Sequence, residues 1–156
     1  MPEHAFFCTL PAERASLAVA VMAAGGVPVL DFTSSPTVPV PDGAWVRVNN
    51  RRSVPGTGPV ILSGSHKQPV RNRETWLEIT EARPVPTGFA GAVLRGSEIG
   101  GPCGAEAGMV LLAGMGQDQK VILDANLNPR DAAAALAAGA VGVVLSEMLY
   151  GLGEMA

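Results

Sequence analysis

The segment VILDANLNPRDAAAALAAGAVGVVL, residues 121–145, reads as a strand, a helix and a second strand. Its first apolar run ends at Asp124, and another apolar run closes the segment. Between the two, Asn128 can cap a helix and Pro129 suits the first helical position, while Gly139 ends the helix. Strands joined by a helix normally lie parallel in one sheet. The segment therefore predicts an α/β protein with a parallel sheet.

Short apolar runs recur along the rest of the chain, and nearly all of them end at turn residues. Several are apolar without alternation, which is typical of strands buried on both faces. Trp45 and Trp76 fall within these runs, so we expect both in the core rather than at a ligand. The expected strands are Phe6–Leu10, Val27–Phe32, Ala44–Asn49, Val60–Ser63, Trp76–Ile79, Phe89–Arg95, Lys120–Asp124 and Val141–Leu145.

Helices are predicted at Ala12–Ala24, Ala105–Ala113 and Asn128–Ala138. The connections between Phe32 and Phe89 are rich in Pro, Gly and Arg, and none is periodic enough for a substantial helix. Because parallel pairing normally needs a long crossover, the middle strands either pair irregularly or have lost most of their helices.

We therefore predict an α/β fold of the reduced (β/α), TIM-like barrel kind, with about eight short, mainly parallel strands and several helices lost in the middle. Residues 1–150 are expected to form this single domain, and residues 151–156 a tail or linker. The 156 residues, 47% of them hydrophobic, are enough for one continuous core and too few for two.

The composition also narrows the classes of function. A net charge of -3 argues against general nucleic-acid binding, which needs many cationic contacts to phosphate. The chain shows no signal peptide, and its longest apolar stretch, Ala15–Ala24, is too short to span a membrane. Cys8 and Cys103 lack metal-ligand spacing, so we expect free thiols, no metal site and a cytoplasmic protein.

Three segments, Leu10–Phe32, Trp76–Gly104 and Val121–Leu149, together resemble the nitronate monooxygenase (2-nitropropane dioxygenase-like) TIM barrels. The pattern is most similar to the barrel domains associated with polyketide and polyunsaturated fatty acid synthases. Its most specific part is a G-x-E-x-G-G turn after a predicted strand, formed by Gly96, Glu98, Gly100 and Gly101. The resemblance implies FMN at the carboxyl ends of the strands, and oxidation of nitronates or reduction of enoyl-acyl chains.

The phosphate site that the resemblance implies is altered in this chain. The glycine pair expected after the seventh strand is replaced by Ala125 and Asn126, and Ser146 and Glu147 follow the eighth. A glutamate about 4 Å from a dianionic phosphate would cost on the order of several kcal/mol. Pro102 stands where nitronate monooxygenases have a histidine, and proline cannot act as a base. These departures point away from flavin chemistry, and we expect no cofactor.

Three functions remain open. The first is a degenerate flavin barrel with a structural, docking or dimerisation role in polyketide or fatty acid biosynthesis. The second is an active FMN-dependent oxidoreductase of the nitronate monooxygenase or enoyl reductase type. Its FMN would be held by Gly96, Glu98, Gly100, Gly101, Asn126 and Ser146. The third is a different barrel enzyme or ligand-binding module that uses strand-end carboxylates for acid–base chemistry.

Polar residues gather at the ends of predicted strands, where a barrel would bring them to one mouth. They are Asp31, Asn49, Ser63, Glu98, Asp124 and Asn126. Chains also carry polar residues simply because they turn there. The candidate catalytic residues are Glu98, Asp124 and His66, although His66 can equally be a solvated loop histidine.

A basic stretch lies between Asp42 and Glu74, with no acidic residue inside it. It consists of Arg47, Arg51, Arg52, Lys67, Arg71 and Arg73. It can contact a synthase module, an acyl carrier protein or the phosphopantetheine phosphate, or it can be an ordinary solvated face. Missing barrel helices would also expose the backs of strands, which predicts a homodimer or contact with an adjoining synthase domain.

Overall fold

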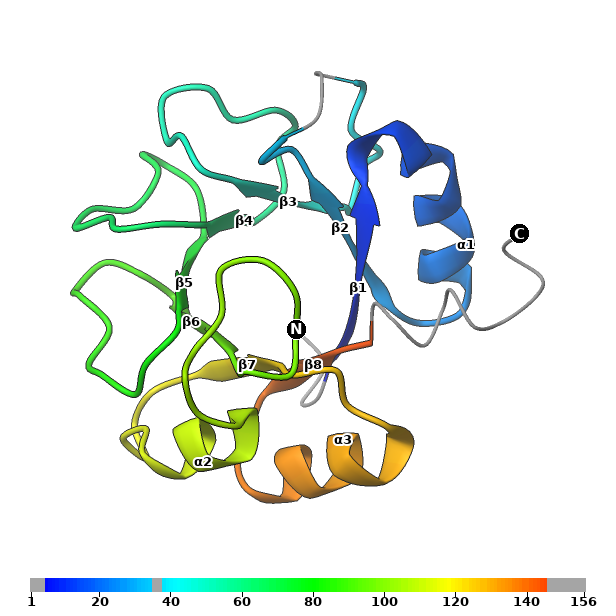
Figure 1. The fold of residues 1–156 in the computed structure, drawn as a ribbon. Helices are drawn as coiled ribbons and strands as arrows, with labels where there is room; N and C mark the ends of the chain where they lie inside the picture. Colours follow the sequence, from blue (N-terminus) through cyan, green and yellow to red (C-terminus); the bar gives the residue numbers. More distant parts are fainter. Residues whose placement is uncertain (1–4, 35–37, 146–156) are drawn as a thin grey trace.

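The computed structural model describes residues 5–34 and 38–145, and these form a closed barrel of eight strands (Figure 1). Every neighbouring pair of strands is parallel, and β8 pairs with β1 to close the ring. The strands are β1 (Ala5–Pro11), β2 (Val27–Asp31), β3 (Trp45–Val48), β4 (Val60–Leu62), β5 (Thr75–Ile79), β6 (Gly91–Arg95), β7 (Val121–Asp124) and β8 (Gly142–Val144). Each coincides with a predicted strand, so the parallel barrel is confirmed.

The helices are few and short. A 3₁₀ helix, η1 (Ala12–Leu17), continues into α1 (Ala18–Ala23), and α2 (Gly108–Ala113) and α3 (Pro129–Ala137) complete the set in the described residues. At α3 the Asn128 side chain accepts a hydrogen bond from the Asp131 backbone N–H at 2.9 Å, which confirms the expected cap.

The helices cover only part of the barrel wall (Figure 1). They lie outside the strands at the two ends of the chain, and between β2 and β6 the described residues contain no helix. The predicted loss of helices in the middle is therefore confirmed over this part of the structure.

Loops take the place of helices over β3 and β4. The outward side chains Val46, Val48, Val60 and Leu62 are at most 3% exposed. Loop and strand-end side chains pack over them, namely Phe32, Val40, Val54, Val70 and Phe89. The expectation of exposed strand backs is therefore wrong for these strands, because loops cover them. Removing each aliphatic side chain from water stabilises the fold by about 1.5 to 3 kcal/mol, which favours this cover. Strands β3 and β4 therefore give no support to the predicted homodimer.

Aromatic rings fill the barrel interior toward the amino ends of the strands. The Phe7 and Trp45 ring centroids are 4.8 Å apart in an edge-on arrangement, and those of Trp45 and Trp76 are 5.9 Å apart. The expected core position of both tryptophans is confirmed. Aliphatic side chains of the same cluster include Val29, Ile61, Val93, Ile122 and Val144. The interior is thus filled at the amino end, so a site inside the barrel lies at the carboxyl end.

Within residues 5–34 and 38–145, no helix has both the length and the apolar character needed to cross a membrane. The predicted tail, residues 151–156, lies outside the described residues.

Candidate functional site

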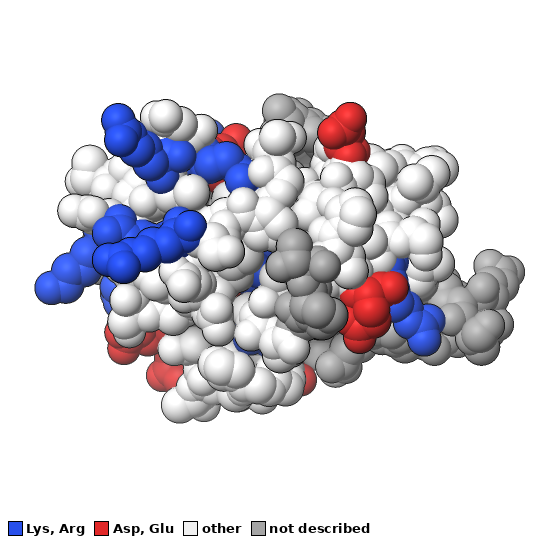
Figure 2. All heavy atoms as spheres, turned by 90° about the horizontal axis from the view of Figure 1, so that it is seen from above, with Lys and Arg blue, Asp and Glu red and all other residues white. Residues whose placement is uncertain are grey.

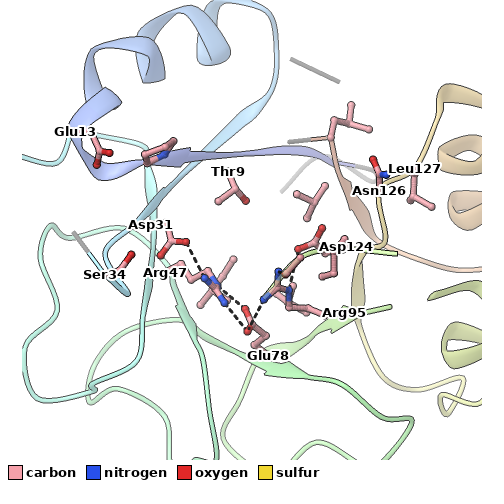
Figure 3. A pocket seen from close by; sticks show the side chains of 17 residues that line it. Thr9, Glu13, Asp31, Ser34, Arg47, Glu78, Arg95, Asp124, Asn126 and Leu127 are labelled. Carbon is pink, nitrogen blue, oxygen red and sulfur yellow. Dashed lines mark hydrogen bonds and ion pairs between the residues drawn. The ribbon is translucent and has the colours of Figure 1, made fainter. Parts of the chain in front are cut away.

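Five of the eight strands carry a charged side chain that faces the barrel interior near the carboxyl end (Figure 3). The alternation of side chains along each strand puts these positions on the same face as the buried aromatic layer. We call this set the charged ring. It consists of Asp31 on β2, Arg47 on β3, Glu78 on β5, Arg95 on β6 and Asp124 on β7.

Strand register brings neighbours in the charged ring together. Asp31 lies opposite Arg47 across the β2–β3 pair, and Arg95 lies opposite Asp124 across the β6–β7 pair. The ring is therefore a direct product of parallel pairing.

Arg47 connects two carboxylates in the ring. Its Nη1 donates to Asp31 Oδ2 at 2.9 Å, while its Nε and Nη2 donate to the two oxygens of Glu78 at 2.6 and 2.8 Å. The Arg47 and Glu78 side chains are only 13% and 4% exposed. Burial lowers the pKa of Arg47, but the hydrogen bonds and charges of Glu78 and Asp31 outweigh it and raise that pKa. Arg47 thus makes a bidentate ion pair with Glu78 and a second ion pair with Asp31.

Glu78 also accepts hydrogen bonds from two other groups. The Ser63 hydroxyl donates to Glu78 Oε1 at 2.9 Å, and Arg95 Nη1 donates to the same oxygen at 3.4 Å. The second Arg95 nitrogen, Nη2, donates to the Gly100 carbonyl at 3.0 Å. Glu78 on β5 is thus the common acceptor for Arg47 on β3, Arg95 on β6 and Ser63, which follows β4.

Asp124 is less well satisfied than the other carboxylates. Its Oδ2 lies 3.3 Å from Arg95 Nε, yet this enclosed nitrogen makes no hydrogen bond within the described residues. Burial raises the pKa of Asp124 to about 6, against the opposing charge of Arg95. A carboxyl group with such a pKa can exchange a proton near neutral pH, which suits acid–base chemistry.

A pocket of about 420 Å³ lies at the mouth, lined by the charged ring and by Glu13 of η1. Thr9 and Asn126 add uncharged polar groups, and neither side chain makes a hydrogen bond within the part of the chain that the structure describes. The apolar lining comes from Ile61, Val93, Ile99, Leu127, Val144 and Leu145. The volume of the pocket falls in the range of small-molecule sites, roughly 300 to 1,000 Å³.

The structure brings some of the expected strand-end residues together. Asp31, Asp124 and Asn126 line the pocket, and Ser63 joins the ring through Glu78. Asn126 has a φ of 49°, a left-handed conformation that asparagine tolerates better than most residues.

Three other expected residues have different places. The exposed Asn49 donates to the Thr33 carbonyl, and Glu98 accepts from the Gly108 backbone N–H at 3.0 and 3.1 Å, where α2 begins. The His66 ring Nε2 lies 3.0 Å from the Ser63 carbonyl in the loop after β4. None of the three lines the pocket.

The glycines of the G-x-E-x-G-G turn mostly shape their own loop. A Cβ at Gly96 would lie 2.5 Å from the Gly108 backbone nitrogen, so the loop closes where a side chain would stand. Gly100 lines the pocket, while Gly101 has a φ of 73° and open space around it. Ser146, which was expected to complete the phosphate site, and Glu147 lie outside the described residues.

Arg47 and Arg73 do not belong to an exposed basic stretch. Arg47 is inside the barrel, and Arg73 donates to the carbonyls of Gly56 and Gly58, so it holds the loop between β3 and β4. The other four residues of the basic stretch are exposed: Arg51, Arg52, Lys67 and Arg71. We call these four the basic face; Lys and Arg side chains gather at one end of the surface in Figure 2.

Sequence reasoning missed Glu78 and Arg95, and misplaced Arg47. Each is a single charge near the carboxyl end of an otherwise apolar run, in WVRV, TWLEI and GAVLR. A charge at an inward position of a buried strand needs a partner, so three such runs together could have indicated an internal ion network.

Comparison of the chain with protein-family models, with curated proteins and with solved structures finds no match, so the resemblance to nitronate monooxygenases stays a prediction from its motif.

Proposed function

We propose that this chain is a reduced TIM-like barrel that binds a small organic molecule in its carboxyl-end pocket without flavin. The observation that carries the proposal is the incompletely hydrogen-bonded Asp124 beside a pocket of about 420 Å³. Barrels of parallel strands place their sites at this end, where loops and strand ends converge. A pocket with a few convergent polar groups and a shifted pKa is the best candidate for a binding site.

The charge of the mouth argues against a flavin phosphate. The charged ring has three carboxylates and two guanidinium groups, and both guanidinium groups already pair with carboxylates. A dianionic phosphate would meet an excess of negative charge with no uncommitted cation in the ring. We therefore propose a degenerate flavin barrel, in the sense that the mouth has exchanged phosphate contacts for an internal ion network.

Titration with FMN tests the flavin part of the proposal. We expect neither quenching of FMN fluorescence nor a shift of its absorbance between about 350 and 500 nm. Tight FMN binding would contradict the proposal and favour the alternative, an FMN-dependent oxidoreductase.

A pocket-filling variant tests the binding part. Gly100 lines the pocket and a Cβ there meets no atom within 4 Å, so Gly100→Trp adds a bulky ring at the pocket with no clash at its first carbon. Ligand-observed NMR with a fragment mixture should detect binders of the wild type that are lost in this variant. Val110→Trp, on an exposed position of α2, is the matched control and should keep them. Equal binding by all three proteins would contradict the proposal.

A second candidate function is docking of an acidic partner, which the basic face supports. A groove of about 490 Å³ is lined by Arg51, Arg52, Gln68, Pro69, Val70 and Arg71. Its position between two loops suits a phosphopantetheine phosphate or an acidic protein such as an acyl carrier protein.

Charge reversal tests this docking. The double variant Arg52→Glu/Arg71→Glu should abolish binding of an acyl carrier protein in surface plasmon resonance, because two cations of the groove become anions. Arg130→Glu, an exposed position on α3, should leave binding unchanged. No detectable binding by the wild type would remove this candidate.

A further inference from the structure

We propose that the carboxyl-end pocket selects a protonated amine attached to a compact apolar body, with Asp124 as the acceptor of the ammonium group. The inference rests on the proposed binding function and names the chemical class of its ligand. It is carried by the charge balance of the ring, the unequal satisfaction of its carboxylates and the apolar lining.

The charge balance favours a cation. Three carboxylates face two guanidinium groups in the charged ring, and Glu13 adds a further carboxylate to the pocket lining, so negative charge is in excess. The ring is partly buried, where charges are screened less than at the surface. A bound cation would reduce this excess, whereas an anion would add to it.

Asp124 is the carboxylate that can accept the ammonium group. Asp31 already accepts from Thr33 and Arg47, and Glu78 accepts from Arg47, Ser63 and Arg95. The contact of Asp124 with Arg95 Nε, by contrast, does not have hydrogen-bond geometry. Acceptor capacity in the ring is therefore concentrated at Asp124.

Two uncharged polar side chains, Thr9 on β1 and Asn126 after β7, also line the pocket (Figure 3). Their hydroxyl and amide oxygens can accept from the remaining N–H groups of an ammonium ion. The ion pair of Arg47 with Asp31 lies across the pocket from Asp124 (Figure 3).

The rest of the lining suits an apolar body. Ile61, Val93 and Val144 form the floor beneath the charged ring, and Ile99, Leu127 and Leu145 contribute further apolar surface. A ligand with charge at several points would leave this surface against polar groups, which is unfavourable. One cationic end and one compact hydrocarbon part match the pocket.

Three probes of nearly equal shape separate charge from size: cyclohexylamine, cyclohexanol and cyclohexanecarboxylate. Their affinities for the wild type are measured by ligand-observed NMR at about pH 8, where Asp124 is ionised and the amine is protonated. We expect the amine to bind about tenfold more tightly than the alcohol, as one charge-assisted hydrogen bond provides, and the carboxylate to bind most weakly.

Variants assign this preference to one residue. Asp124→Asn keeps the shape of the side chain and should bring the amine and the alcohol within about threefold of each other. Asp118→Asn removes one exposed carboxylate outside the pocket and should keep the tenfold preference.

The outcomes separate the two proposals. If the alcohol binds and the amine has no advantage in the wild type, the amine class is wrong while the pocket function stands. Tightest binding of the carboxylate would also overturn the amine class. If no probe binds and Gly100→Trp changes nothing in the fragment experiment, both proposals fail. Because the order of probes is measured in the wild type, the test holds even if Asp124→Asn does not fold.

Discussion

Among the carboxylates of the charged ring, Glu78 accepts the largest number of hydrogen bonds. Its two oxygens accept from Arg47, Ser63 and Arg95, and its side chain is 4% exposed. A buried ion network of this kind adds little net stability compared with apolar packing, but it is sensitive to the loss of one member. Loss of Glu78 would leave two guanidinium groups enclosed with too few acceptors.

Glu78→Gln should therefore destabilise the fold by about 3 to 5 kcal/mol, because it removes the charge that compensates Arg47 and Arg95. Urea denaturation followed by circular dichroism measures this free energy of unfolding. Glu81→Gln, which removes an exposed ion pair with Arg83, should change it by less than about 0.5 kcal/mol. Similar losses in both variants would show that the ring has no special role in stability.

The raised pKa of Asp124 predicts that its contribution to the free energy of unfolding depends on pH with the opposite sign to that of a paired carboxylate. Its pKa is raised from 3.8 to about 6 by burial, so the folded state binds the proton more strongly than the unfolded state. The contribution of Asp124 to stability is therefore most favourable below about pH 4, and it falls as the pH rises to about 6. Arg95, Glu78 and Arg47 act on the same carboxyl group and set the size of this shift.

Wild type and Asp124→Asn, unfolded with urea at several pH values, isolate this effect. The stability of the wild type relative to the variant should fall by on the order of 2 kcal/mol between about pH 4 and about pH 6. A difference that stays constant over this range would mean that Asp124 titrates as an ordinary surface carboxylate, and a change in the other direction would mean that folding lowers its pKa.

At the scale of elements, the chain builds the same barrel wall with two kinds of cover. Short helices lie beside β1, β7 and β8, whereas loops cover β3 and β4 (Figure 1). The strands and helices could be predicted because their apolar runs and caps have a regular local signal. The loop cover could not, since Val40, Val54 and Val70 are single apolar residues in loops without a period.

Glycines at the starts of strands let the aromatic layer fit inside the wall. A Cβ at Gly142 would lie 2.5 Å from the Phe7 ring and 2.9 Å from the Ala5 carbonyl oxygen. Gly142→Ala should destabilise the protein by about 1 to 3 kcal/mol, since the ring must move. Gly100→Ala, where the added Cβ meets open space, is the control and should be nearly neutral in thermal unfolding. Equal loss in both would mean that the ring moves aside freely.

At the scale of the whole molecule, the position of the site could be predicted better than its chemistry. Asp31, Asp124 and Asn126 follow strand ends, and parallel strands bring such ends to one mouth. The pairing of Arg47 with Glu78 joins residues 31 positions apart, and no local pattern contains it. Arg47 also lies close in sequence to exposed cations, which concealed its inward orientation.

The layer of Phe7, Trp45 and Trp76 limits how a small molecule can enter and leave the barrel. Because these three rings fill the amino end of the barrel, the pocket within the described residues opens at the carboxyl end, and a bound molecule would leave by the route through which it entered. Arg51 and Arg52 follow the carboxyl end of β3, on the side of that opening. A macromolecule bound there would block the opening of the pocket. The residence time of a ligand in the pocket should therefore be longer when the partner is bound.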